Sequence, residues 1–251
     1  MNTQSVLSAR STGAVATRVL TQLRRDHRTL AMLLVLPCAV MSLLWWMFHG
    51  LPGNGFSGLG PALLALIPFI IMFLVTSVTT LRERTSGTLE RLLAMPMGKL
   101  DFLLGYAAAF GLVAAVQSAL AVSACVWLLD LTVVGSIWML MLVAVVDALL
   151  GTALGLFVSA FARTEFQAVQ FMPALVIPQL LLCGLFVPRD ALPRVLEVVS
   201  DVLPLSYAVD AMQGVAASTG TAEVWRDVAL VAAYVVAGLA LGALTLRRRT
   251  P

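Results

Sequence analysis

One acidic residue of the sequence lies within an apolar run, where a charged side chain is energetically unfavourable. Asp147 stands near the middle of an apolar run that extends from about residue 133 to residue 162. A charged carboxylate at that depth of a membrane costs about 3 kcal/mol or more, unless it is neutral, paired or in contact with water. Two interpretations stay open for Asp147: a site on a polar pathway or proton relay, and a protonated or hydrogen-bonded structural side chain. Its possible hydrogen-bonding partners are Gln117, Ser118 and Thr152.

Three glutamines form a second polar feature within an apolar run. Gln167 and Gln170 are three residues apart, so on a helix they share a face, and Gln179 follows in the same run. Pro173 and Pro178 interrupt this run. The glutamine face could line a cavity or a subunit contact, or it could make ordinary hydrogen bonds between helices.

Motifs typical of an enzyme are missing from the sequence. Gly98-Lys99 is followed by leucine and lacks the upstream glycine of a phosphate-binding P-loop, so we expect no ATP site in this chain. The metalloprotease motif H-E-x-x-H and the nucleophile motif G-x-S-x-G are also missing. The three cysteines, Cys38, Cys125 and Cys183, lie in apolar runs and form no C-x-x-C pair. We therefore expect no catalytic residue, no metal site, no disulfide and no cofactor bound by the chain itself.

The long polar interruption between the second and third apolar runs is the basic stretch from Arg82 to Asp101. Its residue pattern indicates a short amphipathic helix. Gly87 breaks the preceding helix, Thr88 can cap the next one, and Pro96 ends it. Leu89, Leu92 and Leu93 would share one face, with Glu90 and Arg91 off that face. A helix of about 10 Å is too short to be stable alone, so we expect it to press against a partner.

The composition places the whole chain in a membrane. Of its 251 residues, 60% are hydrophobic and 12% are charged, about half the charge of a soluble domain. We expect an all-α membrane protein with two parts: residues 1–28, a cytoplasmic tail with an amphipathic connecting helix, and residues 29–251, one six-span domain. The expected spans are residues 29–48, 61–81, 102–129, 133–162, 166–187 and 228–246.

The distribution of basic residues predicts the topology. Of the 16 lysines and arginines, only Arg189, Arg194 and Arg226 fall on the side opposite the basic stretch. Positive charge stays on the cytoplasmic side, so both termini and the basic stretch are expected there. The net charge of +3 is explained in this way and does not indicate nucleic-acid binding.

Two amphipathic segments lie beside the spans. In residues 11–28, Val15, Val19, Leu20 and Leu23 share a side, which predicts a helix in the cytoplasmic interface. In residues 188–227, two short helices broken at Pro204 are expected either to dip back into the outer leaflet or to form a surface hairpin.

Two motifs resemble the permease subunits of ABC type-2 exporters, which include the daunorubicin-resistance-type membrane subunits. The first runs from Glu83 to Leu92 (ERTSGTLERL), with Met95-Pro96 and then Gly105 after it. The second comprises Phe186-Val187-Pro188 and the stretch from Leu203 to Ala211 (LPLSYAVDA). By this resemblance, Pro188, Pro204, Tyr207 and Asp210 belong to an outer re-entrant motif before the last span.

The resemblance implies partners for the chain. Such permeases dimerise and bind two cytoplasmic ABC ATPase subunits, which hold the ATP and Mg²⁺. We expect a second permease copy or a homologous permease, and contact with the lipid bilayer. The residues that the resemblance assigns to coupling with the ATPase are Glu83, Arg84, Gly87, Thr88, Leu89, Glu90, Arg91, Leu92, Leu93 and Met95. Spans 1, 2 and 5 would surround the translocation path, whose candidate residues are Gln167, Gln170, Pro173 and Asp147.

The same resemblance suggests a function and its alternatives. The chain is expected to be the permease of an exporter in the plasma membrane of a bacterium, moving a lipophilic drug or lipid out of the cytoplasm or inner leaflet. Few aromatic residues lie along spans 3, 4 and 6, which favours a lipophilic cargo over a polysaccharide. A polysaccharide-exporting ABC permease remains one alternative. An ion-coupled secondary transporter or channel that uses Asp147 is the other.

Overall fold

The computed structural model describes residues 9–49, 55–86, 99–218 and 220–245, and within them it contains helices and no strand. Six of the described helices are long and apolar enough to cross a membrane. This confirms the all-α class and the six expected spans. The helices are α1 (Ala9–Arg25), α2 (His27–Phe48), α3 (Gly55–Thr85), α5 (Lys99–Trp127), α6 (Ile137–Val158), α7 (Glu165–Leu182), η1 (Arg189–Ala191), α8 (Arg194–Val202), α9 (Pro204–Ala217) and α10 (Thr221–Thr245).

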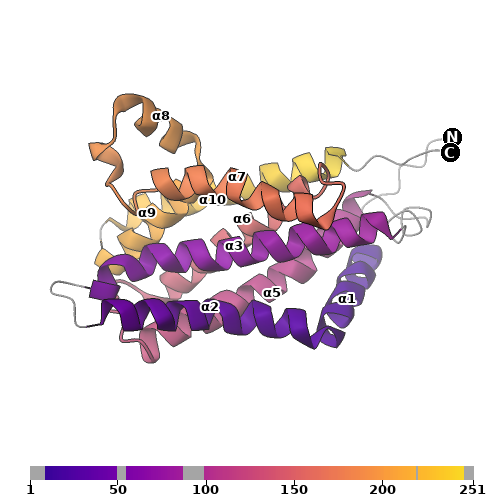
Figure 1. Cartoon of the computed structure of the whole chain (residues 1–251), viewed down its shortest axis with the longest axis horizontal. Coiled ribbons are helices and arrows are strands. Elements are labelled where there is room, and N and C mark those ends of the chain that lie inside the picture. Colours follow the sequence, from indigo (N-terminus) through magenta and orange to yellow (C-terminus); the bar gives the residue numbers. More distant parts are fainter. Residues whose placement is uncertain (1–8, 50–54, 87–98, 219, 246–251) are drawn as a thin grey trace.

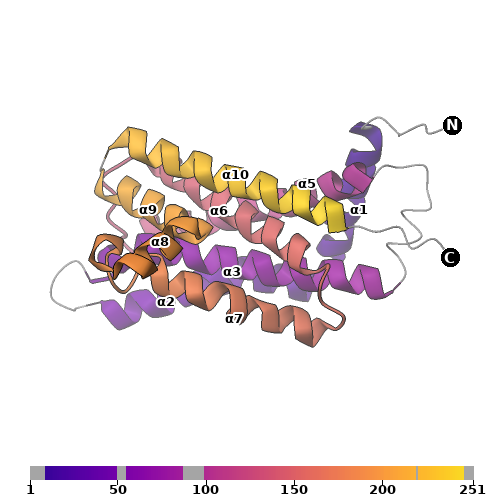
Figure 2. The same cartoon turned by 90° about the horizontal axis from the view of Figure 1, so that it is seen from above.

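Helix α6 is the centre of the bundle (Figures 1 and 2). It packs against α3, α5, α9 and α10. Apolar residues surround it on every side, and most of them are buried, although Trp138 and Leu142 are exposed. The long helices lie side by side, whereas α1 runs across one end of the bundle. We call this the α1 end and the opposite end, where α8 and α9 lie, the α8 end.

Two glycines of α6 allow it to pack closely on α3. A Cβ atom on Gly151 would lie 2.4 Å from the carbonyl oxygen of Phe69, and one on Gly155 would lie 2.6 Å from that of Phe73. No side chain fits in such a space, so the backbones of the two helices touch. In a membrane, where lipid tails are as apolar as leucine, close packing of this kind drives helix association. The G-x-x-x-G spacing of α6 therefore serves packing within the chain.

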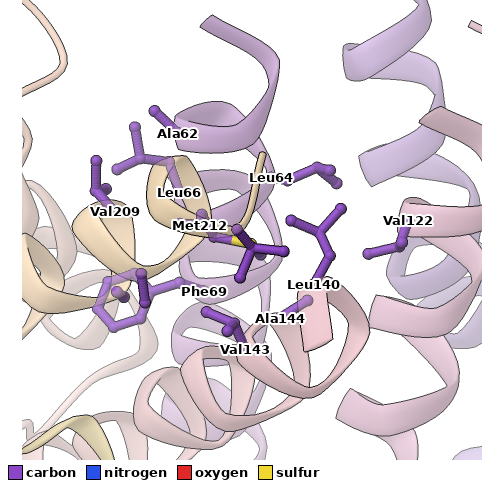
Figure 3. Packing of buried hydrophobic residues seen from close by; sticks show 14 of the residues in the cluster. Ala62, Leu64, Leu66, Phe69, Val122, Leu140, Val143, Ala144, Val209 and Met212 are labelled. Atoms are coloured by element: carbon purple, nitrogen blue, oxygen red, sulfur yellow. The ribbon is translucent and has the colours of Figure 1, made fainter. Parts of the chain in front are cut away.

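The core nearest the α8 end joins α3, α5, α6 and α9 (Figure 3). Leu66 and Phe69 of α3 lie near Leu140 and Val143 of α6 and Met212 of α9, and all five are nearly or fully buried. Helix α9 is thus an internal element, although its 14 residues are too few to cross a membrane. Helix α8, in contrast, stands out from the bundle, and most of its side chains are exposed.

Two helices are shorter than the expected spans. Helix α6 begins at Ile137 rather than Val133, because the backbone before it is bonded elsewhere: Val134 N–H donates to Ala216 C=O at 2.9 Å and Gly135 N–H to Val215 C=O at 3.1 Å. Helix α7 ends at Leu182 rather than Val187. Gly184 follows with a φ of +88°, in the left-handed region that ends helices.

The α3–α6 packing can be tested at Gly151. Gly151→Ala should lower the free energy of unfolding by about 1–3 kcal/mol, because the new Cβ atom must push α6 away from the Phe69 carbonyl. The measurement is the midpoint of thermal unfolding in detergent.

The matched control for this substitution is Gly13→Ala in α1, where a Cβ atom meets nothing within 4 Å. It should leave the midpoint unchanged or raise it slightly, since alanine favours helix. Equal midpoints for the two variants would contradict the close packing of α3 on α6.

Candidate functional site

The structure describes only part of the stretch assigned to coupling. Glu83 and Arg84 belong to the last turn of α3. Gly87, Thr88, Leu89, Glu90, Arg91, Leu92, Leu93 and Met95 lie outside the described residues. The expected short helix therefore stays a prediction, and the structure bears on the elements at either end of it, α3 and α5.

Both of these elements are bonded to α1. Arg18 of α1 pairs with the buried Glu83 of α3, with 3.4 Å between Nη2 and Oε1. The Thr12 hydroxyl of α1 donates to Asp101 Oδ1 of α5 at 3.4 Å. At Gly105 of α5 a Cβ atom would lie 2.6 Å from that of Val15, so α1 and α5 approach as closely as α3 and α6 do. We call this set of contacts the α1 junction.

The apolar side of α1 faces protein. Val15, Val19 and Leu23 are buried, and they belong to one cluster with Phe102 and Tyr106 of α5. Leu20, which the sequence also placed on this side, is half-buried. The structure adds that this side packs on the bundle, which holds α1 across the α1 end.

A second ionic contact at the α1 end joins α3 to α7. Arg82 binds Glu165 with two hydrogen bonds, 2.7 Å from Nε and 2.9 Å from Nη2. The paired geometry suits a guanidinium and a carboxylate, but both side chains are at least half exposed, so the contact contributes little to stability. It fixes where α7 begins relative to the end of α3.

Asp147 is completely enclosed by the bundle. It is 0% exposed, and neither carboxyl oxygen has a hydrogen-bonding partner among the described residues. Two of the expected partners are engaged elsewhere, since Ser118 donates to Ala144 C=O and Thr152 to Ala148 C=O, each at 3.0 Å. The third, Gln117, is also buried, and its amide atoms have no partner among the described residues either. An enclosed carboxyl without a cationic partner is favoured in its neutral form.

The glutamines of α7 are in different environments. Gln167 takes part in capping: its N–H donates to the Thr164 hydroxyl at 3.2 Å, and its side-chain oxygen accepts from Arg163 N–H at 2.9 Å. Gln170 is exposed, and Pro173 is half-buried in the middle of α7. Gln170 and Pro173 are therefore reachable from outside the chain, whereas Asp147 is not.

The second sequence motif converges on Arg189 at the α8 end. This guanidinium forms ion pairs with Asp210 of α9 and Asp201 of α8, and its Nε donates to the Ser200 hydroxyl at 2.9 Å. It also lies 5.3 Å from the ring centroid of Tyr207, within the range of a cation–π contact. The pKa of the Asp210 carboxyl lies above its ordinary value, because burial raises it more than Arg189 lowers it. We call this set of side chains the Arg189 cluster.

Backbone contacts tie the Arg189 cluster to α7. The Ser200 hydroxyl donates to Leu182 C=O at 2.8 Å and lies 3.1 Å from the Ser206 hydroxyl. The side-chain oxygen of Gln179 accepts from Leu205 N–H at 3.3 Å. Pro188 caps the 3-10 turn before α8, and Pro204 is the first residue of α9. The cluster thus holds α8 and α9 against the end of α7.

Two residues of these contacts were missed by reasoning from the sequence. Arg189 was assigned only to the outer side, and Arg18 only to the polar side of an interfacial helix. The available signal for Arg189 was its place directly after Pro188, inside the motif, with acidic residues following it. Nothing in the sequence indicates that Arg18 pairs with Glu83, because the two residues are 65 positions apart.

Comparisons with known proteins agree with this architecture. The model of the ABC-2 type transporter family matches residues 10–216. The chain is 25% identical to ABC transporter G family member 20 of Dictyostelium discoideum over 205 residues, 80% of this chain and 28% of that protein. It is 28% identical to the probable multidrug ABC transporter permease YbhR of Escherichia coli over 150 residues, 60% of this chain and 41% of YbhR. It is 26% identical to the inner membrane transport permease YhhJ of Escherichia coli over 147 residues, 58% of this chain and 39% of YhhJ. The chain therefore covers less than half the length of each of these relatives.

The Arg189 cluster can be tested with a thiol that the chain already contains. Arg189→Ala should lower the free energy of unfolding by about 1–3 kcal/mol, because it leaves partly buried carboxyl and hydroxyl groups without a donor. It should also make the buried Cys183, one residue before Gly184, react faster with a maleimide. Mass spectrometry of the labelled peptides measures this rate.

Arg194→Ala serves as the matched control for Arg189. The Arg194 side chain is 82% exposed, and within the part of the chain that the structure describes it pairs only with Glu197 of its own helix. It should change neither the stability nor the labelling of Cys183, with buried Cys125 as internal reference. Slow labelling of Cys183 in both variants would mean that Arg189 does not hold this end of the bundle together.

Asp147 can be tested by an amide of the same shape. Asp147→Asn should leave the free energy of unfolding within about 1 kcal/mol of the wild type, because an enclosed neutral carboxyl and an amide differ little in solvation. Asp210→Asn, at an ion-paired carboxylate, should destabilise the protein. A folded Asp147→Asn variant without transport would support a proton relay at this residue instead.

Proposed function

The chain belongs to the ABC-2 type transporter family, and we propose that it is the membrane-spanning permease subunit of an ATP-driven exporter. The observation that carries this proposal is the family match over residues 10–216, which includes five of the six candidate spans. The matched region runs from α1 through α9, so it takes in both the α1 junction and the Arg189 cluster.

ATP and Mg²⁺ would be held by two separate cytoplasmic ATPase subunits. In this proposal the leucines of residues 87–95 enter a groove of the ATPase, and Glu90 and Arg91 lie at the rim. A short helix with one apolar face suits such a groove. The chain itself supplies no catalytic residue.

The α1 junction offers a route by which motion of that stretch would reach the spans. The stretch is bounded by α3 on one side and α5 on the other, and both are bonded to α1 through Glu83 and Asp101. A displacement of residues 87–98 would therefore move α1, α3 and α5 together. Glu83 acts in this scheme inside the permease, as the link between α3 and α1.

The translocation path would run along α2, α3 and α7. Helices α2 and α7 flank α3 (Figure 1), and both expose apolar side chains along much of their length. A second permease, either a copy or a homologue, would complete the path from the other side. We place the exposed Gln170 and the half-buried Pro173 along it, and we assign the enclosed Asp147 a structural role.

The cargo is proposed to be lipophilic, a drug or a lipid. Two relatives whose names include multidrug transport, YbhR and YbhS of Escherichia coli, support this class. Polysaccharide export is the second candidate within the same architecture. Ion-coupled transport through Asp147 is favoured by one observation, the unpartnered buried carboxyl, and the Asp147→Asn experiment above decides it.

The orientation follows from the basic residues. We propose that the α1 end faces the cytoplasm, with both termini on that side, in the cytoplasmic membrane of a bacterium. Arg10, Arg18, Arg24, Arg25 and Arg28 lie at this end together with Arg82, which agrees with the excess of positive charge on cytoplasmic segments.

The proposal is tested most directly at the leucines of the coupling stretch. Leu89→Asp or Leu92→Asp should release or uncouple the ATPase, because a carboxylate would be forced into an apolar groove. The amount of ATPase that copurifies with the permease should fall at least tenfold. The measurements are ATPase copurification and substrate-stimulated ATP hydrolysis, with membrane insertion checked for each variant.

Arg91→Ala is the control in the same stretch. A charge at the rim of an interface contributes little to binding, so this variant should stay close to the wild type. If the Leu→Asp variants bind the ATPase and transport normally, residues 87–95 are a connecting loop and the coupling proposal is wrong.

A further inference from the structure

The corner between α1 and α2 carries three arginines without an acidic partner. Arg24 and Arg25 end α1, and Arg28 lies in the first turn of α2. All three side chains are exposed, and they form no ion pair within the described residues. We call this set the arginine corner.

The acidic groups near the arginine corner are already engaged. Asp26, the single residue between the two helices, accepts hydrogen bonds from the N–H of Thr29 at 3.1 Å and from its hydroxyl at 2.6 Å. These bonds cap α2 and hold the pKa of Asp26 below its ordinary value. Glu165 of α7 is bound by Arg82. The corner therefore keeps an excess of positive charge, because its three arginines outnumber the single carboxylate of Asp26.

Arg28 also stands at the head of an apolar stripe on α2. Residues spaced by three or four lie on one face of a helix, and the residues at this spacing from Arg28 are all exposed: Met32, Val35, Ala39, Leu43 and Trp46. The side chains of Met32, Val35 and Trp46 are 62%, 61% and 74% exposed. From Arg28 to Trp46 the stripe measures about 27 Å, close to the roughly 30 Å thickness of the hydrocarbon layer.

We propose that the arginine corner binds an anionic phospholipid of the leaflet at the α1 end. The phosphate would lie against Arg24, Arg25 and Arg28, and an acyl chain would follow Met32 and Val35. Cations at one end of an exposed apolar stripe complement a molecule with an anionic head and an apolar tail. The inference depends on α2 crossing a membrane with this stripe turned to lipid, so the second permease of the proposed function would complete the path along α3 and α7. It is independent of the exporter's cargo and ATPase, so either of those proposals can fail without it.

Charge favours a lipid over a second copy of the chain at this place. In a two-fold symmetric contact the same patch meets itself, so an arginine corner at the two-fold axis would meet three further arginines. A phospholipid brings the opposite charge. A second copy at this surface is nevertheless an outcome that the test distinguishes.

The test compares two pairs of arginines at the same end of the bundle. The full chain is purified in mild detergent, and binding of added phosphatidylglycerol and phosphatidylcholine with identical acyl chains is measured by native mass spectrometry. The wild type should prefer phosphatidylglycerol. Arg24→Gln with Arg28→Gln should weaken its binding about 25-fold, about fivefold for each cation. This double variant and the control pair described next are each checked for monodispersity and for an unchanged midpoint of thermal unfolding.

The control pair, Arg10→Gln with Arg163→Gln, removes the same charge from exposed arginines that form no ion pair within the described residues. It should change phosphatidylglycerol binding less than twofold. An equal loss of phosphatidylglycerol binding in the two double variants would overturn the proposal, because it would indicate general attraction of the lipid to a basic surface.

Two further measurements separate the other occupants. Glycerol phosphate in millimolar excess should not displace phosphatidylglycerol from the wild type, because the acyl chain contributes to binding; displacement would indicate a site for a free anion and overturn the proposal. Val35→Cys should form no disulfide between copies in lipid vesicles. Efficient crosslinking would show that a second copy covers the stripe and would also overturn it.

Discussion

The contact on which the bundle depends is the direct packing of the α6 backbone on the α3 backbone at Gly151 and Gly155. In water, a helix can be held by burying apolar surface, but in a membrane lipid offers the same apolar contact, and only closer packing distinguishes protein from lipid. Helix α6 gains this closeness on its α3 side and then serves as the surface for α5, α9 and α10. The more peripheral helices, α2, α7 and α10, keep exposed faces that remain for other molecules.

Polar contacts gather at the two ends of this apolar bundle. Backbone and side-chain groups cannot stay unsatisfied within hydrocarbon, so most hydrogen bonds between elements lie at the α1 end, in the α1 junction, or at the α8 end, in the Arg189 cluster. Both groups hold short or transverse helices that could not be stable alone. Asp147 and Gln117 are exceptions in the interior, as are Thr76, Ser77 and Tyr106, because their buried polar atoms have no partner among the described residues.

The sequence predicted the long helices because periodicity and apolar length suffice to find a span. The presence of helix α1 was equally readable, since its periodicity depends on neighbours along the chain. The pairing of Arg18 with Glu83 was not, because 65 residues separate them. The burial of α9 was also beyond reach, because fourteen half-apolar residues suit a surface hairpin as well as an internal helix. Only its packing against α3, α6 and α10 decides between them. Among the candidate path residues, Gln167 could have been read as a capping residue from Thr164 three positions before it.

The α1 junction has a consequence for the order in which the protein assembles at the ribosome. Thr12 and Asp101 are 89 residues apart in the chain, and synthesis adds about 5–20 residues per second. The apolar side of α1 is therefore made several seconds before the surface of α5 that buries it. During this interval Val15, Val19 and Leu23 need another apolar surrounding, which the membrane surface beside the translocon provides. The first helix of the bundle thus reaches its final place only after α5 has been made.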